Sequence, residues 1–326
     1  MTKTGDPSTV LSWETLQALV ARPGELVIDV DYAGMNYADH LLIKGEYQVA
    51  LPLPCVPGSE FVGRVREVGA GTSLSVGTRV MGLALPPFGT FAEQCVALEA
   101  RCEPLPEDLP GPEATCLIGN YVTAHLALHR RAGVVPHDVV LVTGAAGGVG
   151  TAAIQIAKAA GARVIAADLG ADRAESCLAS GADHAVDVTD RHELTRLVTE
   201  VTKGKGADIV VDLVGGDLFE VVRRLVAFEG RVVIVGFTGG TIPQIRLNQL
   251  LLRSFGVLGV NALTVLEKYP DIHRAARSAV VELLATGAVA PALAGVFPMT
   301  DLPATSIALA GRKLRGKAVL ITKRKA

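Results

Sequence analysis

The sequence has few of the residues that mark disulfide-rich or metal-binding proteins. It contains five cysteines, an odd number, and no two of them form a CxxC pair, so neither a disulfide framework nor a zinc ribbon is indicated. None of its seven histidines clusters with others in the way metal ligands do. His125 and His129 lie four positions apart, and we interpret them as ordinary helix residues. The spacing of these residue types predicts no metal site.

The sequence also lacks an excess of one charge and any long apolar run. Its net charge is -2 with scattered basic residues, which gives no electrostatic case for nucleic acid or an anionic membrane. No apolar run approaches the roughly 20 residues of a membrane-spanning helix. The polar stretch Met1–Thr9 is not followed by the apolar core of a signal peptide. We therefore expect a soluble, cytoplasmic protein without nucleic-acid or membrane partners.

The 326 residues, 49% of them hydrophobic, predict two domains with substantial cores. The first third is punctuated by glycine and proline and contains strand patterns at 26–30 and 61–68, which is typical of a small β-rich unit. From Asp138 onward, strand and helix patterns alternate, which predicts βαβ units and a parallel sheet. The segment from 261 is too short for a domain of its own, and we expect it to pack on the first domain.

The most informative motif runs from Gly144 to Gly150, between a buried strand pattern and a helix pattern. Glycines let backbone approach a dinucleotide pyrophosphate, and a helix N-terminus supplies N–H groups and partial positive charge. Ala145 weakens the usual glycine spacing, but the strand–turn–helix context supports the interpretation. The predicted contact residues are Ala146, Gly147, Gly148, Val149 and Gly150.

Asp168 ends the second strand of this predicted unit, eighteen residues after Gly150 (168 − 150). An acidic residue there accepts hydrogen bonds from the adenosine ribose and repels a 2′-phosphate, which favours NADH. Arg173 lies five residues further on and could instead bind a phosphate. Asp168 could also be a simple helix-entry residue, so the sequence leaves the cofactor preference open.

Several of these segments together resemble the zinc-independent quinone oxidoreductases, or zeta-crystallin family, of the medium-chain dehydrogenase/reductase superfamily. The likeness rests on the motif with Gln155 and Lys158, and on the stretches 34–39, 45–47, 57–61, 215–216 and 236–237. It covers nearly the whole chain. It implies a Rossmann doubly wound parallel sheet inserted in a β-rich GroES-like catalytic domain, with boundaries at 1–120, 121–260 and 261–326.

The resemblance also implies roles for individual residues. Asn36 would contact the nicotinamide end of the cofactor, although it could merely cap a turn. Tyr47 matches a tyrosine proposed to donate a proton in related enoyl-thioester reductases, or it could serve only as an aromatic lid. The other residues implied at the nicotinamide end are Thr123, Val214, Gly215, Gly236 and Phe237.

Zinc-dependent alcohol dehydrogenases of the superfamily have metal ligands at three positions occupied here by Asn36, Ser59 and Asn120. These side chains cannot supply the three N, S or carboxylate ligands of a catalytic zinc, so we expect none. Without zinc, no group strongly polarises an alcohol oxygen. Quinones and enones accept a hydride more easily and therefore fit better as substrates. The resemblance therefore implies an NAD(P)H-dependent quinone or enone reductase, using NADPH or NADH.

Two other functions remain compatible with the sequence. One is a 2-enoyl-thioester reductase, although no basic channel for a phosphopantetheine is apparent. The other is a catalytically silent NAD(P)H-binding sensor or structural protein.

Family members are usually dimers or dimer-based tetramers, and the strand pattern at 255–259 would lie at a sheet edge that a second subunit can cover. We therefore expect a homodimer.

Overall fold

A computed structural model describes residues 1–47 and 50–322 of the chain. Contacts divide it into two units, one formed by Met1–Ile118 with Leu293–Ala326 and the other by Gly119–Ala292. Residues 261–292, which the resemblance assigned to the second part of the catalytic domain, fall in the second unit. The reason is local packing, because helix α10 (Ala262–Lys268) contacts α11 (Pro270–Ala285), and α11 contacts α4 (Val122–His125).

The first unit is built around a mostly antiparallel sheet with strand order β11-β12-β1-β2-β3-β4. Strand β1 also pairs with β4, which closes β1 to β4 into a barrel-like ring around a core of side chains such as Leu26, Phe61 and Cys95. The strands of this sheet are β1 (Glu25–Met35), β2 (Glu60–Val68), β3 (Arg79–Ala84), β4 (Gln94–Pro104), β11 (Leu293–Pro298) and β12 (Lys317–Ile321).

Short helices surround this sheet. Helix α2 follows β1 directly and ends where Gly45 adopts a left-handed conformation with φ 77°, a position that favours glycine. The helices of this unit are α1 (Pro7–Val10), α2 (Tyr37–Lys44), α3 (Gly111–Cys116), the 3₁₀ helix η3 (Met299–Asp301) and α12 (Leu302–Ala310), and the π-helix η1 (Leu117–Tyr121) begins at the end of this unit and continues into the second.

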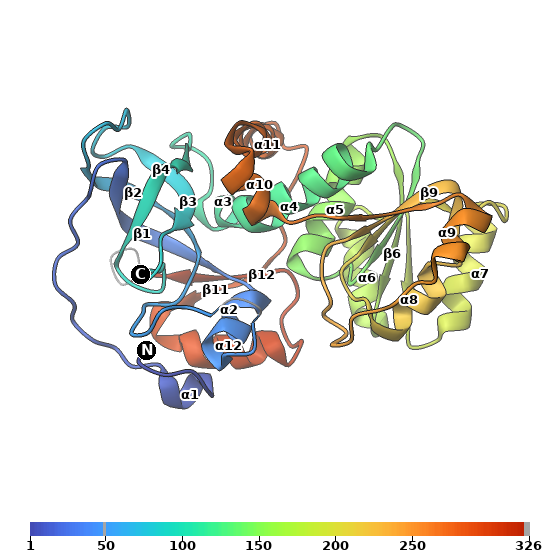
Figure 1. Ribbon diagram of the computed structural model, residues 1–326, viewed down its shortest axis with the longest axis horizontal. Coiled ribbons are helices and arrows are strands. Elements are labelled where there is room, and N and C mark those ends of the chain that lie inside the picture. The colour runs from blue at the N-terminus through green and yellow to red at the C-terminus, as the bar shows by residue number, and fades with distance from the viewer. Residues whose placement is uncertain (48–49, 323–326) are drawn as a thin grey trace. The chain divides into compact units, whose positions relative to one another are not determined.

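The second unit contains a six-stranded parallel sheet with strand order β10-β9-β8-β5-β6-β7, flanked by helices (Figure 1). Parallel strands must be joined by crossovers, which explains the alternation of strand and helix patterns in the sequence. The strands are β5 (Val139–Thr143), β6 (Arg163–Asp168), β7 (His184–Asp187), β8 (Ala207–Asp212), β9 (Val226–Ile234) and β10 (Gly256–Gly259).

The remaining helices of this unit are the π-helix η2 (Leu126–Ala132), α5 (Gly148–Ala159), α6 (Ala171–Ala179), α7 (Arg191–Val201), α8 (Gly216–Val222) and α9 (Leu247–Arg253). Helices α7 and α8 pack on one another and on the sheet through a core that includes Leu194, Val198, Phe219, Ile165 and Val210. The predicted parallel α/β sheet is confirmed. Among the described residues, no helix combines the length and the apolar character that crossing a membrane requires.

Candidate active site

The glycine-rich segment forms the turn between β5 and α5, at the carboxyl end of the central strand of the parallel sheet. The first α-helical hydrogen bond runs from Thr151 N to Gly147 O over 2.8 Å. The N–H groups of Gly148, Val149 and Gly150 precede that bond, so they belong to the helix turn that can bind an anion. The structure thus places the predicted pyrophosphate-binding backbone together.

The turn is too tight for side chains at two of its glycines. A β-carbon at Gly150 would lie 2.3 Å from the carbonyl oxygen of Gly144, and one at Gly148 would lie 2.4 Å from Nδ2 of Asn120. Gly144 has a φ of 62°, which favours glycine. The residues therefore fit a dinucleotide, because bare backbone is what the close approach of a pyrophosphate requires.

Asp168 lies at the end of β6 with its carboxylate directed at the same turn. Its Oδ2 accepts a hydrogen bond of 2.7 Å from Ala146 N–H, and its Oδ1 accepts one of 2.8 Å from Leu169 N–H. Arg173 Nε donates to Oδ1 over 2.8 Å, and the two side chains are only 18% and 7% exposed. Arg173 therefore offsets the charge of the carboxylate that would otherwise repel a 2′-phosphate.

The turn after β8 is held by Asp212 and Thr143, two buried residues for which no role was predicted from the sequence. Asp212 Oδ1 accepts hydrogen bonds from Thr143 Oγ1 at 2.6 Å and from the N–H groups of Val214 and Gly215 at 3.1 Å each. A β-carbon at Gly215 would lie 2.9 Å from the Phe237 ring. The structure thus brings Val214, Gly215 and Phe237 together, while Gly236 precedes Phe237 in a half-buried loop.

Gln155 and Lys158, which carry part of the family likeness, make contacts within the second unit. The Gln155 amide oxygen accepts from Tyr121 O–H at 2.7 Å and from Ala290 N–H at 2.9 Å. Lys158 Nζ lies 2.8 Å from Asp183 Oδ1. Thr123 lies half-buried in α4, the helix that packs on α5. Gln155 and Lys158 therefore anchor α5, the helix that follows the glycine-rich turn.

In the first unit, Asn36 stands between β1 and α2 with its side chain bound at both ends. Its Nδ2 donates to Glu60 Oε1 over 2.6 Å, and its Oδ1 accepts from Lys317 Nζ over 2.5 Å. Lys317 Nζ also donates to Glu60 Oε2 over 2.6 Å, and these two side chains are 2% and 4% exposed. No role was predicted from the sequence for Glu60 or Lys317, which are 24 and 281 positions away from Asn36.

A second carboxyl group, Asp39, adjoins this cluster. Its Oδ2 accepts a hydrogen bond of 2.8 Å from Asn36 N–H, and its Oδ1 lies 3.4 Å from Ser59 Oγ. Burial, together with the nearby Glu60 carboxylate, raises the pKa of Asp39 to about 7. Tyr47, the other residue predicted to be catalytic, is 37% exposed. The hydrogen bonds of the Asn36 side chain run to Glu60 and Lys317 and do not involve Tyr47.

The positions of the zinc ligands in related dehydrogenases do not fit a metal here. Asn36 Oδ1 already binds the ammonium group of Lys317, and a second cation beside it would be repelled. Ser59 offers only a hydroxyl group. Within residues 1–47 and 50–322, no group of three or more His, Cys, Asp or Glu residues is arranged to hold a metal ion.

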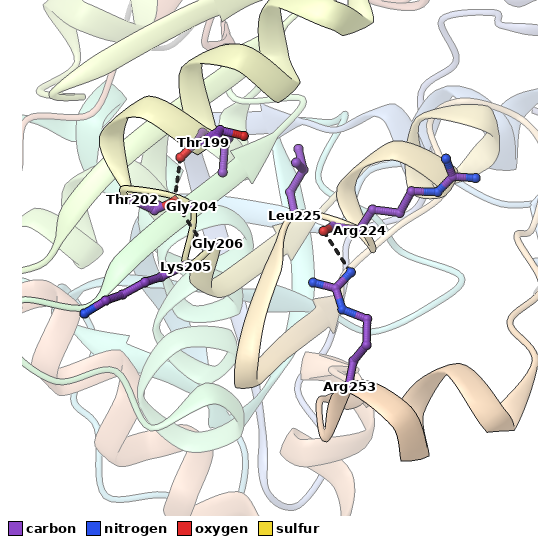
Figure 2. A pocket seen from close by; sticks show the side chains of 9 residues that line it. Thr199, Thr202, Gly204, Lys205, Gly206, Arg224, Leu225 and Arg253 are labelled. Atoms are coloured by element: carbon purple, nitrogen blue, oxygen red, sulfur yellow. Dashed lines mark hydrogen bonds between the residues drawn. The ribbon is translucent and has the colours of Figure 1, made fainter.

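A small hollow of about 60 Å³ lies at the amino ends of β8 and β9, on the sheet edge away from the glycine-rich turn. Figure 2 shows that Arg253 donates a hydrogen bond to the backbone, to Arg224 O over 2.8 Å. Arg253 also donates to Val226 O over 2.8 Å. Small-molecule sites usually exceed about 300 Å³. The hollow is therefore a structural junction, too small for a dinucleotide.

Comparisons with known proteins agree with this architecture. The alcohol dehydrogenase GroES-like domain family matches residues 22–107, and the zinc-binding dehydrogenase family matches 148–279. Quinone oxidoreductase-like protein 2 of Bos taurus is 34% identical over 93% of this chain and 86% of its own length. A probable quinone oxidoreductase of Schizosaccharomyces pombe is 34% identical over 78% of this chain and 75% of its own.

A solved structure of a mycobacterial protein in complex with NADPH superimposes with a TM-score of 0.89. It shares 29% sequence identity, and the alignment covers 98% of each chain. The GroES-like part of the predicted fold and the family resemblance are thereby confirmed. The chain belongs to the quinone oxidoreductase-like family of the medium-chain dehydrogenase/reductase superfamily.

Proposed function

We propose that the protein is an NAD(P)H-dependent oxidoreductase that reduces quinones or α,β-unsaturated carbonyl compounds without a metal. The observation that carries this proposal is the environment of Asn36, where zinc-dependent relatives have a metal ligand and this chain has an amide bound to Lys317 and Glu60. Nothing in that arrangement polarises an alcohol oxygen as a metal would. Acceptors that take a hydride without a Lewis acid fit the site better.

The bound cofactor would supply the hydride, and the chain would bind and orient it. The turn Gly147–Gly150 would hold the pyrophosphate through backbone N–H groups, with Ala146 N–H already bound to Asp168. At the nicotinamide end we propose Asn36, Thr123, the backbone of Val214 and Gly215, and, from the loop after β9, Gly236 and Phe237. Asp212 would keep the Val214–Gly215 turn in place for this task.

Reduction of an enone also needs a proton, and we propose Tyr47 as its donor. A phenol can serve if it is held within reach of the substrate. Tyr47→Phe should then lower kcat for enones and leave quinone reduction nearly unchanged, because the ring remains. If Tyr47→Phe keeps the wild-type activity toward both acceptor classes, Tyr47 serves only as an aromatic lid.

Steady-state kinetics with NADH and NADPH against 1,4-benzoquinone, a long-chain enone and crotonyl-CoA tests the function directly. We expect turnover with the first two acceptors. Faster turnover of crotonyl-CoA would favour an enoyl-thioester reductase instead. Tight cofactor binding without turnover of any acceptor would identify a silent NAD(P)H-binding protein.

We propose that the Asp168–Arg173 pair sets the choice between NADH and NADPH, with Asp168 favouring NADH and Arg173 favouring NADPH. Asp168→Ser should shift the ratio of kcat/KM values toward NADPH. Arg173→Ala is the matched partner variant, and it should shift the ratio toward NADH, since it removes the cation that offsets Asp168. If neither ratio moves, this carboxylate does not select the cofactor.

We also propose a homodimer formed along the β10 edge of the second unit. Helix α9, which leads into β10, buries none of its residues. Its Leu247, Leu251 and Leu252 are 76%, 79% and 76% exposed, an apolar face that monomers rarely leave to solvent. Light scattering should give twice the mass of the chain, and Leu251→Glu should give a monomer. The cytoplasmic location stays a prediction from the sequence.

A further inference from the structure

Lys317 and Glu60 reach one another across a strand that lies between them. Strand β1 pairs with β12, which carries Lys317, and with β2, which carries Glu60. In the register of these pairs, Gly34 of β1 stands opposite both Glu60 and Val319. The ion pair therefore passes over Gly34, close to Met35, where β1 ends, and to Asn36, which follows it.

Gly34 provides the space for this crossing. A β-carbon there would lie 2.7 Å from Glu60 Oε2, 2.8 Å from Lys317 Cε and 3.0 Å from the Thr115 methyl group. Gly34 has an ordinary strand conformation, so glycine is needed at this position for space and not for its backbone freedom. The chain thus accommodates a buried ion pair in a place where a β-carbon at position 34 would collide with both of its side chains.

The chemistry of the two charged groups fixes the orientation of the Asn36 amide. An ammonium group can only donate hydrogen bonds, and a carboxylate can only accept them. Oδ1 must therefore face Lys317 and Nδ2 must face Glu60, as the distances of 2.5 and 2.6 Å show. A flipped amide would place like groups together at both ends. One hydrogen of Nδ2 remains beyond the bond to Glu60.

We propose that Lys317, with Glu60, is a positioning residue that locks the Asn36 amide in a single orientation for hydride transfer. The proposal rests on the proposed function, in which Asn36 contacts the nicotinamide. Lys317 itself, almost fully buried, acts through Asn36 and touches neither cofactor nor substrate. A purely structural ion pair would stabilise the first unit but would not change the state of this amide.

The first test observes the amide without any turnover. The chain has four asparagines, Asn36, Asn120, Asn248 and Asn261, so ¹⁵N-asparagine labelling gives four side-chain NH₂ signal pairs, with Asn36→Ala assigning the relevant one. In the wild type we expect the two Asn36 protons to be well separated and slow to exchange with water. In Lys317→Met the two shifts should move together and exchange should become fast.

Arg79→Met is the matched control, because it removes another buried cation of the same unit. Arg79 donates to the carbonyl groups of Pro106 and Glu107 and is 8% exposed. We expect its Asn36 signals to match those of the wild type. Unchanged Asn36 signals in Lys317→Met would overturn the proposal.

The second test separates chemistry from binding. Lys317→Met should lower kcat by roughly 10- to 100-fold, the range that a slightly misplaced group can produce, while the dissociation constant for NAD(P)H stays within about twofold of the wild type because the nucleotide turn is unchanged. Lys317→Arg, which keeps a donor cation, should recover part of kcat. An unaltered kcat in folded Lys317→Met would overturn the proposal.

Removing the lysine alone leaves a buried carboxylate without its partner, so Lys317→Met could fail to fold. The double variant Lys317→Met/Glu60→Gln has no charge in the cluster and provides the same measurements. If the wild type turns over no acceptor but its Asn36 signals depend on Lys317, the proposed function fails while the positioning role stands. If the wild type turns over acceptors but its Asn36 signals do not depend on Lys317, the positioning role fails and the proposed function stands.

Discussion

The two units of the molecule hold their candidate functional groups in opposite ways. The second unit offers bare backbone, with a turn in which a β-carbon at Gly150 would lie 2.3 Å from another backbone atom. The first unit offers an amide side chain fixed by a buried ammonium group and a carboxylate. A backbone turn is specified by a few adjacent residues, whereas a charge cluster needs side chains from separate strands. The two halves should therefore respond to different kinds of change.

The largest effect, on cofactor affinity and stability together, is expected from Gly150→Ala, which adds a methyl group to the bare backbone of the turn in the second unit. The added methyl group collides with backbone that cannot move aside, so we expect a loss of about 1–3 kcal/mol in the free energy of unfolding and a rise of at least about 100-fold in the dissociation constant for NAD(P)H. Fluorescence titration and denaturant unfolding would measure both quantities.

Gly147→Ala is the control for this prediction. Its β-carbon would lie 3.3 Å from Gly144 O, against 2.3 Å for Gly150, so Gly147→Ala should lower the free energy of unfolding clearly less than Gly150→Ala does. A Gly150→Ala variant that binds cofactor like the wild type would show that the turn does not need bare backbone.

Asp39→Asn tests the charged design of the first unit through its pH dependence. Because the pKa of Asp39 rises from an ordinary 3.8 to about 7, the folded state holds the proton more tightly than the unfolded chain. The stability that this gives is complete below pH 4 and is lost as the pH rises through 7. A difference of about 3 in the pKa of Asp39 corresponds to at most roughly 4 kcal/mol in the free energy of unfolding.

An asparagine cannot ionise, so the variant should gain stability relative to the wild type between about pH 5 and 8. Hydrogen exchange of peptides from β1 and β2 at several pH values would measure this difference. If the difference in stability between the wild type and Asp39→Asn stays constant over this pH range, Asp39 does not hold its proton up to about pH 7.

His273→Gln sharpens the contrast, because the second unit should respond to pH in the other direction. Burial and the neighbouring Arg277 lower the pKa of His273 from 6.5 to about 4. Stability from a depressed histidine is present above pH 6.5 and is lost as the pH falls through 4. The variant should therefore lose less stability on acidification, by up to about 3 kcal/mol.

Hydrogen exchange of α11 peptides between pH 7 and 4 would follow this change. His192→Gln serves as the control, since that side chain is exposed in α7. An acid sensitivity equal in all three proteins would exclude His273 as its source.

Thr143→Val should have the smallest effect of the four. It keeps the shape of the side chain but removes the hydroxyl group that donates to Asp212 and accepts from Leu213 N–H. We expect a loss of about 1 kcal/mol in the free energy of unfolding, the low end of the range for a buried partner left unsatisfied, because Asp212 Oδ1 keeps its bonds from the N–H groups of Val214 and Gly215. The KM for the cofactor should rise modestly as the Val214–Gly215 turn loosens. Thermal unfolding together with kinetics would check both, and an unchanged KM would separate this turn from cofactor binding.

The same contrast explains what could be predicted from the sequence. Strands such as β5 and β8 are continuous apolar runs, and the glycine-rich turn between β5 and α5 is a local pattern, so both are visible without a structure. The resemblance supplied the GroES-like fold, which the irregular pattern of the first third could not have identified. The short strand β7 and helix α7 were not identified, because α7 buries only Leu194 and Val198.

The cluster at Asn36 could not be predicted from spacing. Glu60 was visible as part of a motif, but its partner Lys317 belongs to the final strand, and no local period joins them. Asp212 and Thr143 likewise lie on different strands, 69 positions apart. In each case the signal is a hydrogen bond between distant strands, which only the sheet register reveals.

The position of β12 has a consequence for how the protein is made. This strand pairs with β1 but follows all of Gly119–Ala292 in the sequence. During synthesis, which proceeds from the N-terminus, every strand of the parallel sheet is therefore translated before Lys317. Until β12 has been translated, the Glu60 carboxylate on β2 lacks its counter-ion.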